Sequence, residues 1–251
     1  MKLGIIGGSG LYDLAGLENL GQRKVMTAWG VPSAPLTFGC LHGVELFFLP
    51  RHGSNHHLPP HRINYRANIA ALADVGVTGI VATAAVGGIE HNAGTGVIVV
   101  PDQIIDYTYG REHTYSDGTQ AHPQHVDFSE PYSARLRAAL IGAAADVDIA
   151  VLTRGVYAAT QGPRLESAAE IDRLERDGCT IVGMTGMPEA ALARELGLEY
   201  ANISLVVNPA AGRAHGEITM ADIERELTLG MGQIRRVLSA LTARLSSVGF
   251  G

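Results

Sequence analysis

Short apolar runs that end in glycine or polar turns alternate with stretches of helical spacing along the whole of this 251-residue chain. The first run, Leu3–Ile6, leads directly into Gly7-Gly8-Ser9-Gly10, which predicts a strand followed by a tight turn. Arg62–Val75 instead repeats its apolar residues with helical spacing. Strands that alternate with helices in this way are typical of the α/β class, with a largely parallel or mixed sheet.

The same reasoning assigns an element to most of the chain. Further strands are predicted at Val44–Leu49, Gly79–Val86, Val97–Val100, Ile104–Tyr107, Thr180–Val182 and Tyr200–Val207. Further helices are predicted at Arg135–Ala145, Ala168–Arg176, Glu189–Leu196 and Met220–Leu245. Because no linker, repeat or biased segment interrupts the pattern, we expect a single domain over residues 1–251.

Composition narrows the classes of partner. With 46% hydrophobic residues the chain can bury a core without disulfides. Lys and Arg number 19 against 25 Asp and Glu, and this net charge of −6 argues against a nucleic-acid-binding face while leaving room for a local Arg–His pocket. The chain shows no signal peptide and no apolar run of the ~20 residues that span a bilayer, so we expect no membrane partner. Cys40 and Cys179 have no metal-type spacing, which favours a reduced, cytoplasmic setting.

The glycine-rich turn after the first strand is a candidate anion site. Its small residues let backbone N–H groups face an anion, and Ser9 adds a hydroxyl. Asp13 stands where a dinucleotide fingerprint needs its third glycine, and no Gly-Lys-Ser/Thr of a P-loop follows. The alternative is an ordinary strand-to-helix turn.

Arg51-His52-Gly53 follows the second predicted strand and is a candidate phosphate site. A guanidinium contacts phosphate oxygens in bidentate fashion, and an imidazole can add a donor. The alternative is a solvated surface pair. His56, His57 and His61 follow closely, but they lack the usual zinc-ligand spacing, so we predict no metal site.

Two later turns carry polar residues at the predicted ends of strands. Gly183-Met184-Thr185-Gly186-Met187 opens a helix, where the Thr185 hydroxyl can either reach an anion or cap the helix. Val207 is followed by Asn208, whose amide has donors and an acceptor and so suits the edge of a heterocycle. The alternative for Asn208 is an Asx turn before Pro209.

Taken together, these motifs resemble the methylthioadenosine phosphorylase branch of the purine nucleoside phosphorylase family. The matching stretches lie in the family's order over nearly the whole chain: 5–11, 51–53, 64–68, 83–88, 125–132, 160–166 and 183–190. Within that branch the chain is most similar to the bacterial S-methyl-5′-thioinosine phosphorylases. The resemblance implies a single-domain nucleoside phosphorylase fold with a twisted mixed β-sheet flanked by helices. It also implies a homotrimer that works in purine salvage with inorganic phosphate as co-substrate and no metal or organic cofactor.

The resemblance further implies roles for individual residues. Phosphate would be held by Ser9, Arg51, His52 and Thr185. Met184 would contact the ribose, and the purine would face Ser167, Asn208, Pro209 and Ala210. His125 lies in a segment that reaches a neighbouring subunit's site in relatives. At Ala84 this chain departs from methylthioadenosine enzymes, which carry a phosphate-contacting threonine there.

Two groups of these residues predict the substrate: those that would face the purine and those that would face the 5′ group of the sugar. The resemblance implies that relatives that cleave 6-aminopurines carry aspartates at the positions of Asn208 and Ala210. An Asn amide can instead donate to O6 or accept from a protonated N7. We therefore expect hypoxanthine, or guanine, nucleosides over adenine ones, with Asn208 and His52 as the catalytic residues. Met220 and Ile223 offer apolar contacts that suit a 5′-methylthio group, unless Ile223 is simply core.

The sequence thus predicts an enzyme, a pentosyltransferase of the purine nucleoside phosphorylase type. Its expected reaction is phosphate-dependent cleavage of 5′-methylthioinosine to hypoxanthine and 5-methylthioribose 1-phosphate. A general inosine/guanosine phosphorylase, a nucleosidase that uses water, a non-catalytic nucleoside-binding protein and a dinucleotide oxidoreductase are the alternatives, the last disfavoured by Asp13.

Overall fold

The structure is a computed structural model that describes residues 2–8, 11, 18–119, 122, 125–214 and 219–248, apart from the side chains of Asn19, Leu20, Met220, Asp222 and Val248. The strands are β1 (Lys2–Gly7), β2 (Glu18–Arg23), β3 (Leu36–Leu41), β4 (Val44–Pro50), β5 (Gly79–Gly88), β6 (Ile98–Val99), β7 (Gln103–Asp106), β8 (Val151–Leu152), β9 (Val156–Ala159), β10 (Ile181–Gly183) and β11 (Glu199–Pro209). The helices are α1 (Tyr65–Asp74), α2 (Ala134–Asp146), α3 (Ala168–Arg176), α4 (Gly186–Glu195) and α5 (Met220–Val248), and a 3₁₀ turn covers Pro60–Arg62.

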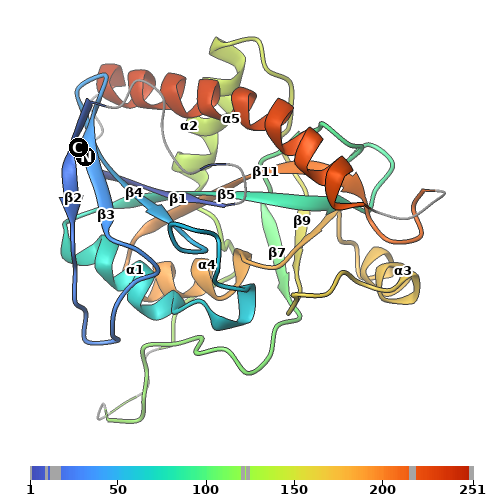
Figure 1. Ribbon diagram of the computed structural model, residues 1–251, viewed down its shortest axis with the longest axis horizontal. Helices are drawn as coiled ribbons and strands as arrows, with labels where there is room; N and C mark the ends of the chain where they lie inside the picture. Colours follow the sequence, from blue (N-terminus) through green and yellow to red (C-terminus); the bar gives the residue numbers. More distant parts are fainter. Residues whose placement is uncertain are drawn as a thin grey trace.

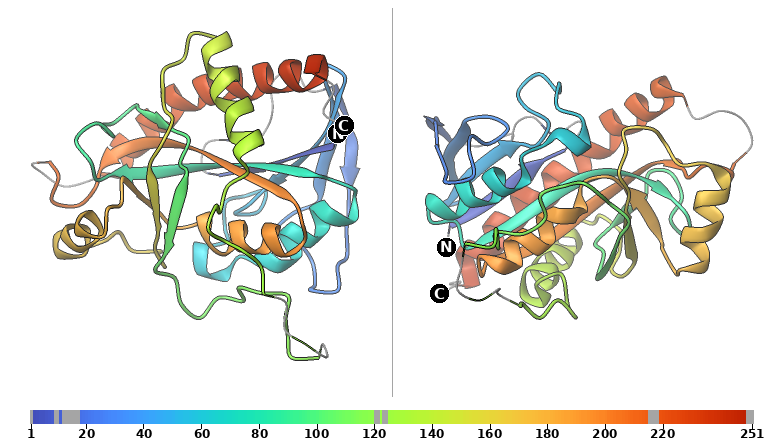
Figure 2. Two further views of the ribbon diagram at one scale, coloured as in Figure 1. Left: turned by 180° about the vertical axis from the view of Figure 1, so that it is seen from behind. Right: turned by 90° about the horizontal axis from the view of Figure 1, so that it is seen from below.

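A twisted mixed sheet forms the middle layer, with helices on both faces (Figure 1). The helices α1 and α4 pack together below the sheet in this view, and α2 and α5 lie above it. The view from behind in Figure 2 shows α2 standing beside α5, while α3 lies at the far end of the sheet. This arrangement confirms the predicted α/β class with a mixed sheet flanked by helices.

The two central strands, β5 and β11, pair in parallel along nearly their whole length. Their side chains are buried on both faces, as expected for strands that have helices above and below. One irregularity interrupts the pairing: the register shifts between Val206 and Asn208, so that Asn208 lies opposite Gly87. This bulge sits at the carboxyl end of β11, next to the loop that leads to α5.

The other edge of β5 is shared by two strands that arrive from opposite directions. β1 runs parallel to the first part of β5, pairing as far as Ile6 with Ala82. β10 runs antiparallel to its last part, pairing Val182 with Gly87. The carboxyl ends of β1 and β10 therefore face each other across residues 83–86, the part of this edge that neither strand covers. Ligand sites in open α/β sheets lie at the carboxyl ends of strands, so this gap is the expected place for one.

The predicted elements are confirmed within a few residues at their ends, and α3 matches at both. The strands β2, β3, β8 and β9 were not predicted from the sequence. β2 lies at the end of the sheet, where its polar sequence Glu-Asn-Leu-Gly-Gln-Arg shows little apolar alternation. No helix among the described residues is both long enough and apolar enough to cross a membrane.

Candidate active site

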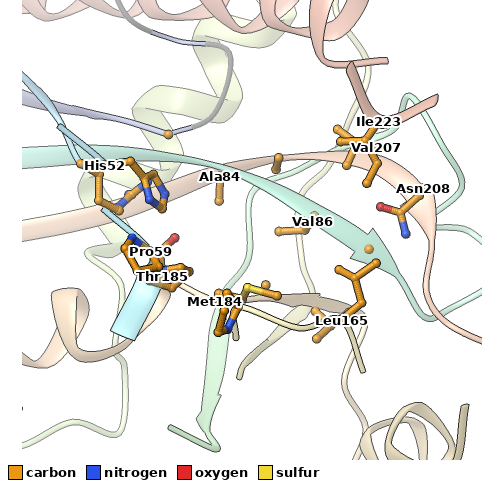
Figure 3. Close-up of a pocket in the computed structure, with 18 of the residues that line it drawn as sticks. His52, Pro59, Ala84, Val86, Leu165, Met184, Thr185, Val207, Asn208 and Ile223 are labelled. Carbon is orange, nitrogen blue, oxygen red and sulfur yellow. The ribbon is translucent and has the colours of Figure 1, made fainter. Parts of the chain in front are cut away.

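A cavity of about 560 Å³ lies in the gap between β1 and β10. Its walls come from the segments that follow β1, β4 and β9, from the carboxyl ends of β10 and β11 and the residues after them, from the second half of β5 and from the start of α5. In Figure 3, His52, Pro59 and Thr185 lie at one end, and Asn208 and Leu165 lie at the other. Ala84, Val86 and Met184 lie between these ends. The volume is within the range typical of small-molecule sites.

Arg51 is the most deeply buried cation of this cavity, with 1% of its surface exposed. Its Nε and Nη2 donate to the two carboxylate oxygens of Glu189, at 2.5 and 2.9 Å, and its Nη1 donates to the Thr83 carbonyl at 2.9 Å. Burial alone would lower the pKa of Arg51, but the Glu189 carboxylate outweighs it and raises the pKa above its usual value. The guanidinium is thus permanently charged and held in one orientation, with one N–H on each Nη left for a ligand.

The backbone at Gly8 approaches Arg51 closely from the end of β1. A Cβ atom at this position would lie 2.7 Å from the Thr83 carbonyl oxygen and 3.1 Å from Arg51 Nη1. Glycine therefore lets the chain after β1 lie this close to the β5 backbone and the Arg51 guanidinium. The Gly8 N–H donates to the Thr83 hydroxyl at 3.0 Å, so it does not face the cavity as an anion donor. The anion-binding role predicted for the other residues of this turn, Ser9 and Gly10, lies outside the described residues and stays a prediction.

His52 lies beside Arg51 and is mostly buried. Its Nδ1 donates to the Leu58 carbonyl at 2.8 Å, which leaves Nε2 as the free ring nitrogen. Burial, and next the positive charge of Arg51, lower the pKa of His52 to about 4. The imidazole is therefore neutral at pH 7, and Nε2 is an acceptor until a bound anion favours its protonation. The His56 ring packs against this ring at a tilt of 37°, with ring centroids 4.6 Å apart.

Thr185 faces the same end from the start of α4. It occupies the N-cap position, yet its side chain makes no capping hydrogen bond. The hydroxyl is therefore not used by the helix, in contrast to the capping alternative. A helix N-terminus favours negative charge, so Arg51, His52, Thr185 and the start of α4 together form an end of the cavity suited to a small anion.

The opposite end combines an amide and a carboxylate. Asn208 Nδ2 donates to the Pro209 carbonyl at 2.6 Å, which leaves its Oδ1 and one N–H for a ligand. Glu166 also lines the cavity, and its Oε1 accepts a hydrogen bond of 2.7 Å from the Thr160 hydroxyl. The remaining wall is apolar, formed by Ile223, Val207 and Leu165 (Figure 3). This end therefore suits a flat heterocycle that has both donors and acceptors along one edge.

Comparison with known proteins identifies the family. Residues 2–243 match the sequence profile of the phosphorylase superfamily. The chain belongs to this superfamily. It is 55% identical to a probable S-methyl-5′-thioinosine phosphorylase of Pseudomonas syringae pv. tomato over 240 residues, which cover 94% of this chain and 98% of that one.

Two further comparisons place the chain within the phosphorylase superfamily. It is 44% identical to a 6-oxopurine nucleoside phosphorylase of Pyrococcus furiosus, over 88% of this chain and 84% of that protein. It superimposes on the methylthioadenosine phosphorylase of Schistosoma mansoni in complex with adenine with a TM-score of 0.94 at 32% identity, covering 98% of this chain and 92% of that one. The resemblance read from the sequence motifs is thereby confirmed at the level of family and fold.

Most residues predicted from the sequence lie together in this phosphorylase cavity. The residues that line it include Arg51, His52, Met184, Thr185, Asn208, Ala210 and Ile223. Ala84 also lines it and offers no hydroxyl, as expected. Ser9 lies outside the described residues, and nothing is described of the Met220 side chain, so these two assignments stay predictions.

Three predicted residues lie elsewhere. Ser167 is exposed and caps α3, where its hydroxyl accepts the Glu170 N–H in a capping box, and the residue before it, Glu166, lines the cavity instead. Pro209 follows Asn208 but is not a lining residue. His125 is exposed in the long segment between β7 and α2, away from the cavity of its own chain. The roles predicted for these three residues remain predictions.

Sequence reasoning missed the two carboxylates of this site. Glu189 is completely buried behind Arg51, and Glu166 lies at the heterocycle end. A signal for Glu189 existed, because an arginine that ends a buried strand needs a counter-ion and Glu189 opens a helix after a glycine turn. The described residues contain no group of three or more His, Cys, Asp or Glu side chains that could hold a metal ion.

Proposed function

We propose that this chain catalyses the phosphorolysis of 6-oxopurine nucleosides and that 5′-methylthioinosine is its main substrate. The products would be hypoxanthine and 5-methylthioribose 1-phosphate. The observation that carries the proposal is a single cavity with an anion-binding end and a heterocycle-binding end on either side of β5 residues 84–87. A nucleoside and a phosphate ion need such an arrangement, with the sugar in the middle.

The anion end supports phosphate as the attacking co-substrate. Arg51 keeps one N–H on each Nη beyond its bonds to Glu189 and Thr83, and Thr185 adds a hydroxyl that α4 does not use. In the reaction, a phosphate oxygen forms a bond to C1′ as the C1′–N9 bond breaks, and the electron pair of that bond leaves with the purine. Fixing the phosphate below the sugar removes much of the entropic cost of bringing the two reactants together.

The heterocycle end supports a 6-oxopurine. N1 of a 6-oxopurine carries a hydrogen that the Glu166 carboxylate can accept, whereas N1 of a 6-aminopurine is an acceptor that the carboxylate would repel. Asn208 can donate to O6 through its free N–H, or accept from N7 once that nitrogen takes a proton. Stabilising the charge that develops on the leaving purine is the second requirement of the reaction.

Apolar side chains in the cavity wall support a preference for a methylthio group at the 5′ position of the nucleoside. Ile223, at the start of α5, lines the cavity, which supports a contact with the substrate in addition to core packing. An apolar wall favours a methylthio group over a hydroxyl by ~1–3 kcal/mol. A general 6-oxopurine nucleoside phosphorylase is the second candidate, because relatives with that name are 40–44% identical to this chain.

The proposal includes the oligomeric state and the cellular location of the protein. A homotrimer in the cytoplasm would bring the segment that contains His125 to the site of a neighbouring subunit, near the 5′ group. Neither a metal nor an organic cofactor is needed for this chemistry, since phosphate supplies the nucleophile and the protein supplies charge and position.

The decisive experiment is a phosphate-dependence panel with 5′-methylthioinosine, 5′-methylthioadenosine, inosine, guanosine and adenosine. We expect base release only with added phosphate, the highest kcat/KM for 5′-methylthioinosine, and pentose 1-phosphate as the second product. Release without phosphate would identify a nucleosidase, and tight binding without release would identify a non-catalytic binding protein. Equal kcat/KM for inosine and 5′-methylthioinosine would favour the general phosphorylase.

A further inference from the structure

Arg111 is a second buried arginine close to the anion end, although it does not line the cavity. It has 8% of its surface exposed and lies in the long segment between β7 and α2. Its guanidinium donates to the carbonyls of Met184 and Met187 at 2.8 and 2.6 Å. It also donates to the Thr160 and Gln161 carbonyls, the Gln161 side chain and the Tyr65 hydroxyl.

All of these partners are uncharged. The acid next to Arg111 in the sequence, Glu112, pairs with Arg66 instead. Within the described part of the chain Arg111 forms no salt bridge, so its positive charge is compensated only by carbonyl, amide and phenol dipoles. A buried charge without a counter-ion is costly, which makes its place in the structure informative.

Together with Glu189, which pairs with Arg51 from behind the cavity wall, the charged side chains of the cavity carry an excess of one negative charge. Among its described lining residues, the formally charged side chains are Arg51 and Glu166. Arg51 is matched by Glu189 at 2.5 Å, and His52 is neutral at pH 7. The Glu166 charge is therefore not offset within the lining, although the proposed co-substrate is itself an anion.

Arg111 lies where it can offset this excess. The carbonyl of Met184 belongs to the peptide group that leads into Thr185, whose N–H donates to the buried Tyr157 hydroxyl at 3.4 Å, so Arg111 Nη1 holds the backbone directly before Thr185. The same nitrogen also holds the Met187 carbonyl, and thus fixes the turn that presents Thr185 at the start of α4. We propose that Arg111 is a positioning residue for phosphate: it fixes the Met184–Met187 turn and supplies the unpaired positive charge that lets the anion end bind its ion.

This inference rests on the proposed phosphorolysis and predicts a selective effect. A unit charge about 10 Å from an anion, at an effective dielectric constant of about 20, changes the binding constant roughly tenfold. We expect Arg111→Gln, which keeps amide donors but removes the charge, to raise the Kd for inorganic phosphate and the KM for phosphate about tenfold. The KM for the nucleoside should change less than threefold in this variant.

The matched variants separate charge from structure. Arg111→Lys keeps the charge without the planar fork, and its phosphate Kd should lie closer to that of the unchanged protein than to that of Arg111→Gln. Arg137→Gln is the control, because Arg137 also donates to carbonyls, those of Pro101, Val100 and Thr153, but lies on α2, on the other face of the sheet. Its variant should lose stability without a change in phosphate Kd.

Calorimetric titration of inorganic phosphate into each variant measures the Kd for phosphate. Kinetics at varied phosphate and nucleoside concentrations then give the two KM values. Thermal unfolding identifies variants that do not fold. Equal phosphate Kd values for Arg111→Gln and the unchanged protein would overturn the inference, as would parallel rises in the phosphate and nucleoside KM values. If the unchanged protein neither binds phosphate nor requires it for base release, the proposed function fails first, and the two failures are thereby distinguished.

Discussion

Asn208 presents an amide at the point where the heterocycle would bind, with one N–H held by Pro209. In Asn208→Asp, two carboxylates, those of residue 208 and Glu166, would face the same edge of the purine. We expect kcat/KM for 5′-methylthioinosine to fall at least tenfold, because an acceptor then faces O6, with a smaller loss for 5′-methylthioadenosine. Steady-state kinetics with both substrates test this, and unchanged turnover of inosine-type substrates would contradict the role of Asn208.

His52 gives a prediction about pH and stability. Its pKa is lowered to about 4 by burial and by Arg51, against about 6.5 in an unfolded chain. Between these values the unfolded state binds more protons, so the free energy of unfolding falls as the pH drops from about 6.5 to 4. In His52→Gln the fall in the free energy of unfolding between pH 6.5 and 4 should be smaller by up to about 3 kcal/mol. Urea unfolding at a series of pH values in phosphate-free buffer measures this difference. If the free energy of unfolding depends on pH equally in both proteins, the lowered pKa assigned to His52 is contradicted.

Single residues at strand ends were the most predictable part of the site. Arg51, His52, Thr185 and Asn208 were predicted because each is polar and lies in the turn after an apolar run, and all four line the cavity. Their roles stay predictions. Glu166 was missed because it stands beside Ser167 in a polar stretch, and only the fold decides which of the two faces the cavity. Side-chain direction in an irregular segment has no period from which it could be read.

Among the elements, the end of β4 and the start of α4 are joined by a buried ion pair. Arg51 and Glu189 have 1% and 0% of their surfaces exposed, and Tyr200 of β11 donates to the same carboxylate at 3.0 Å. Removing one partner leaves a buried charge, so Glu189→Leu should lower the free energy of unfolding by about 3–5 kcal/mol.

The double variant Arg51→Met/Glu189→Leu tests the origin of this loss. It should be more stable than Glu189→Leu alone, because it leaves no unpaired charge. Chemical denaturation of both single variants and the double variant completes the cycle. Additive losses would show that the two side chains stabilise their elements independently of each other.

Elements with strong periodicity were predictable, and those that depend on pairing were not. The period of α3 and the apolar runs of β5 and β11 are visible in the sequence alone. β2 and β9 gain their hydrogen bonds from β3, β7 and β10, and their own sequences are short or polar. The gap on the edge of β5 likewise depends on which strands pair with it, which hydrophobic patterns do not encode.

For the whole molecule, the proposed trimer leads to a complementation test. If His125 acts in a neighbour's site, His125→Ala and Asn208→Ala should each be impaired as separate proteins. Mixed trimers would contain some sites with both residues intact, so activity should return when the two variants are unfolded and refolded together. Sedimentation velocity should give the mass of three chains. A monomeric mass, or no recovery on mixing, would contradict the arrangement.

The bulge near the end of β11 has a consequence for how this site can change. Because the register shifts between Val206 and Asn208, one residue of β11 has no counterpart on β5. Deleting that residue would make the pairing continuous from Val206 to Asn208 while turning Asn208 and the loop to α5 toward a different direction. Substrate range in such a fold can therefore drift by the gain or loss of a single codon, with the sheet and the anion end left unchanged.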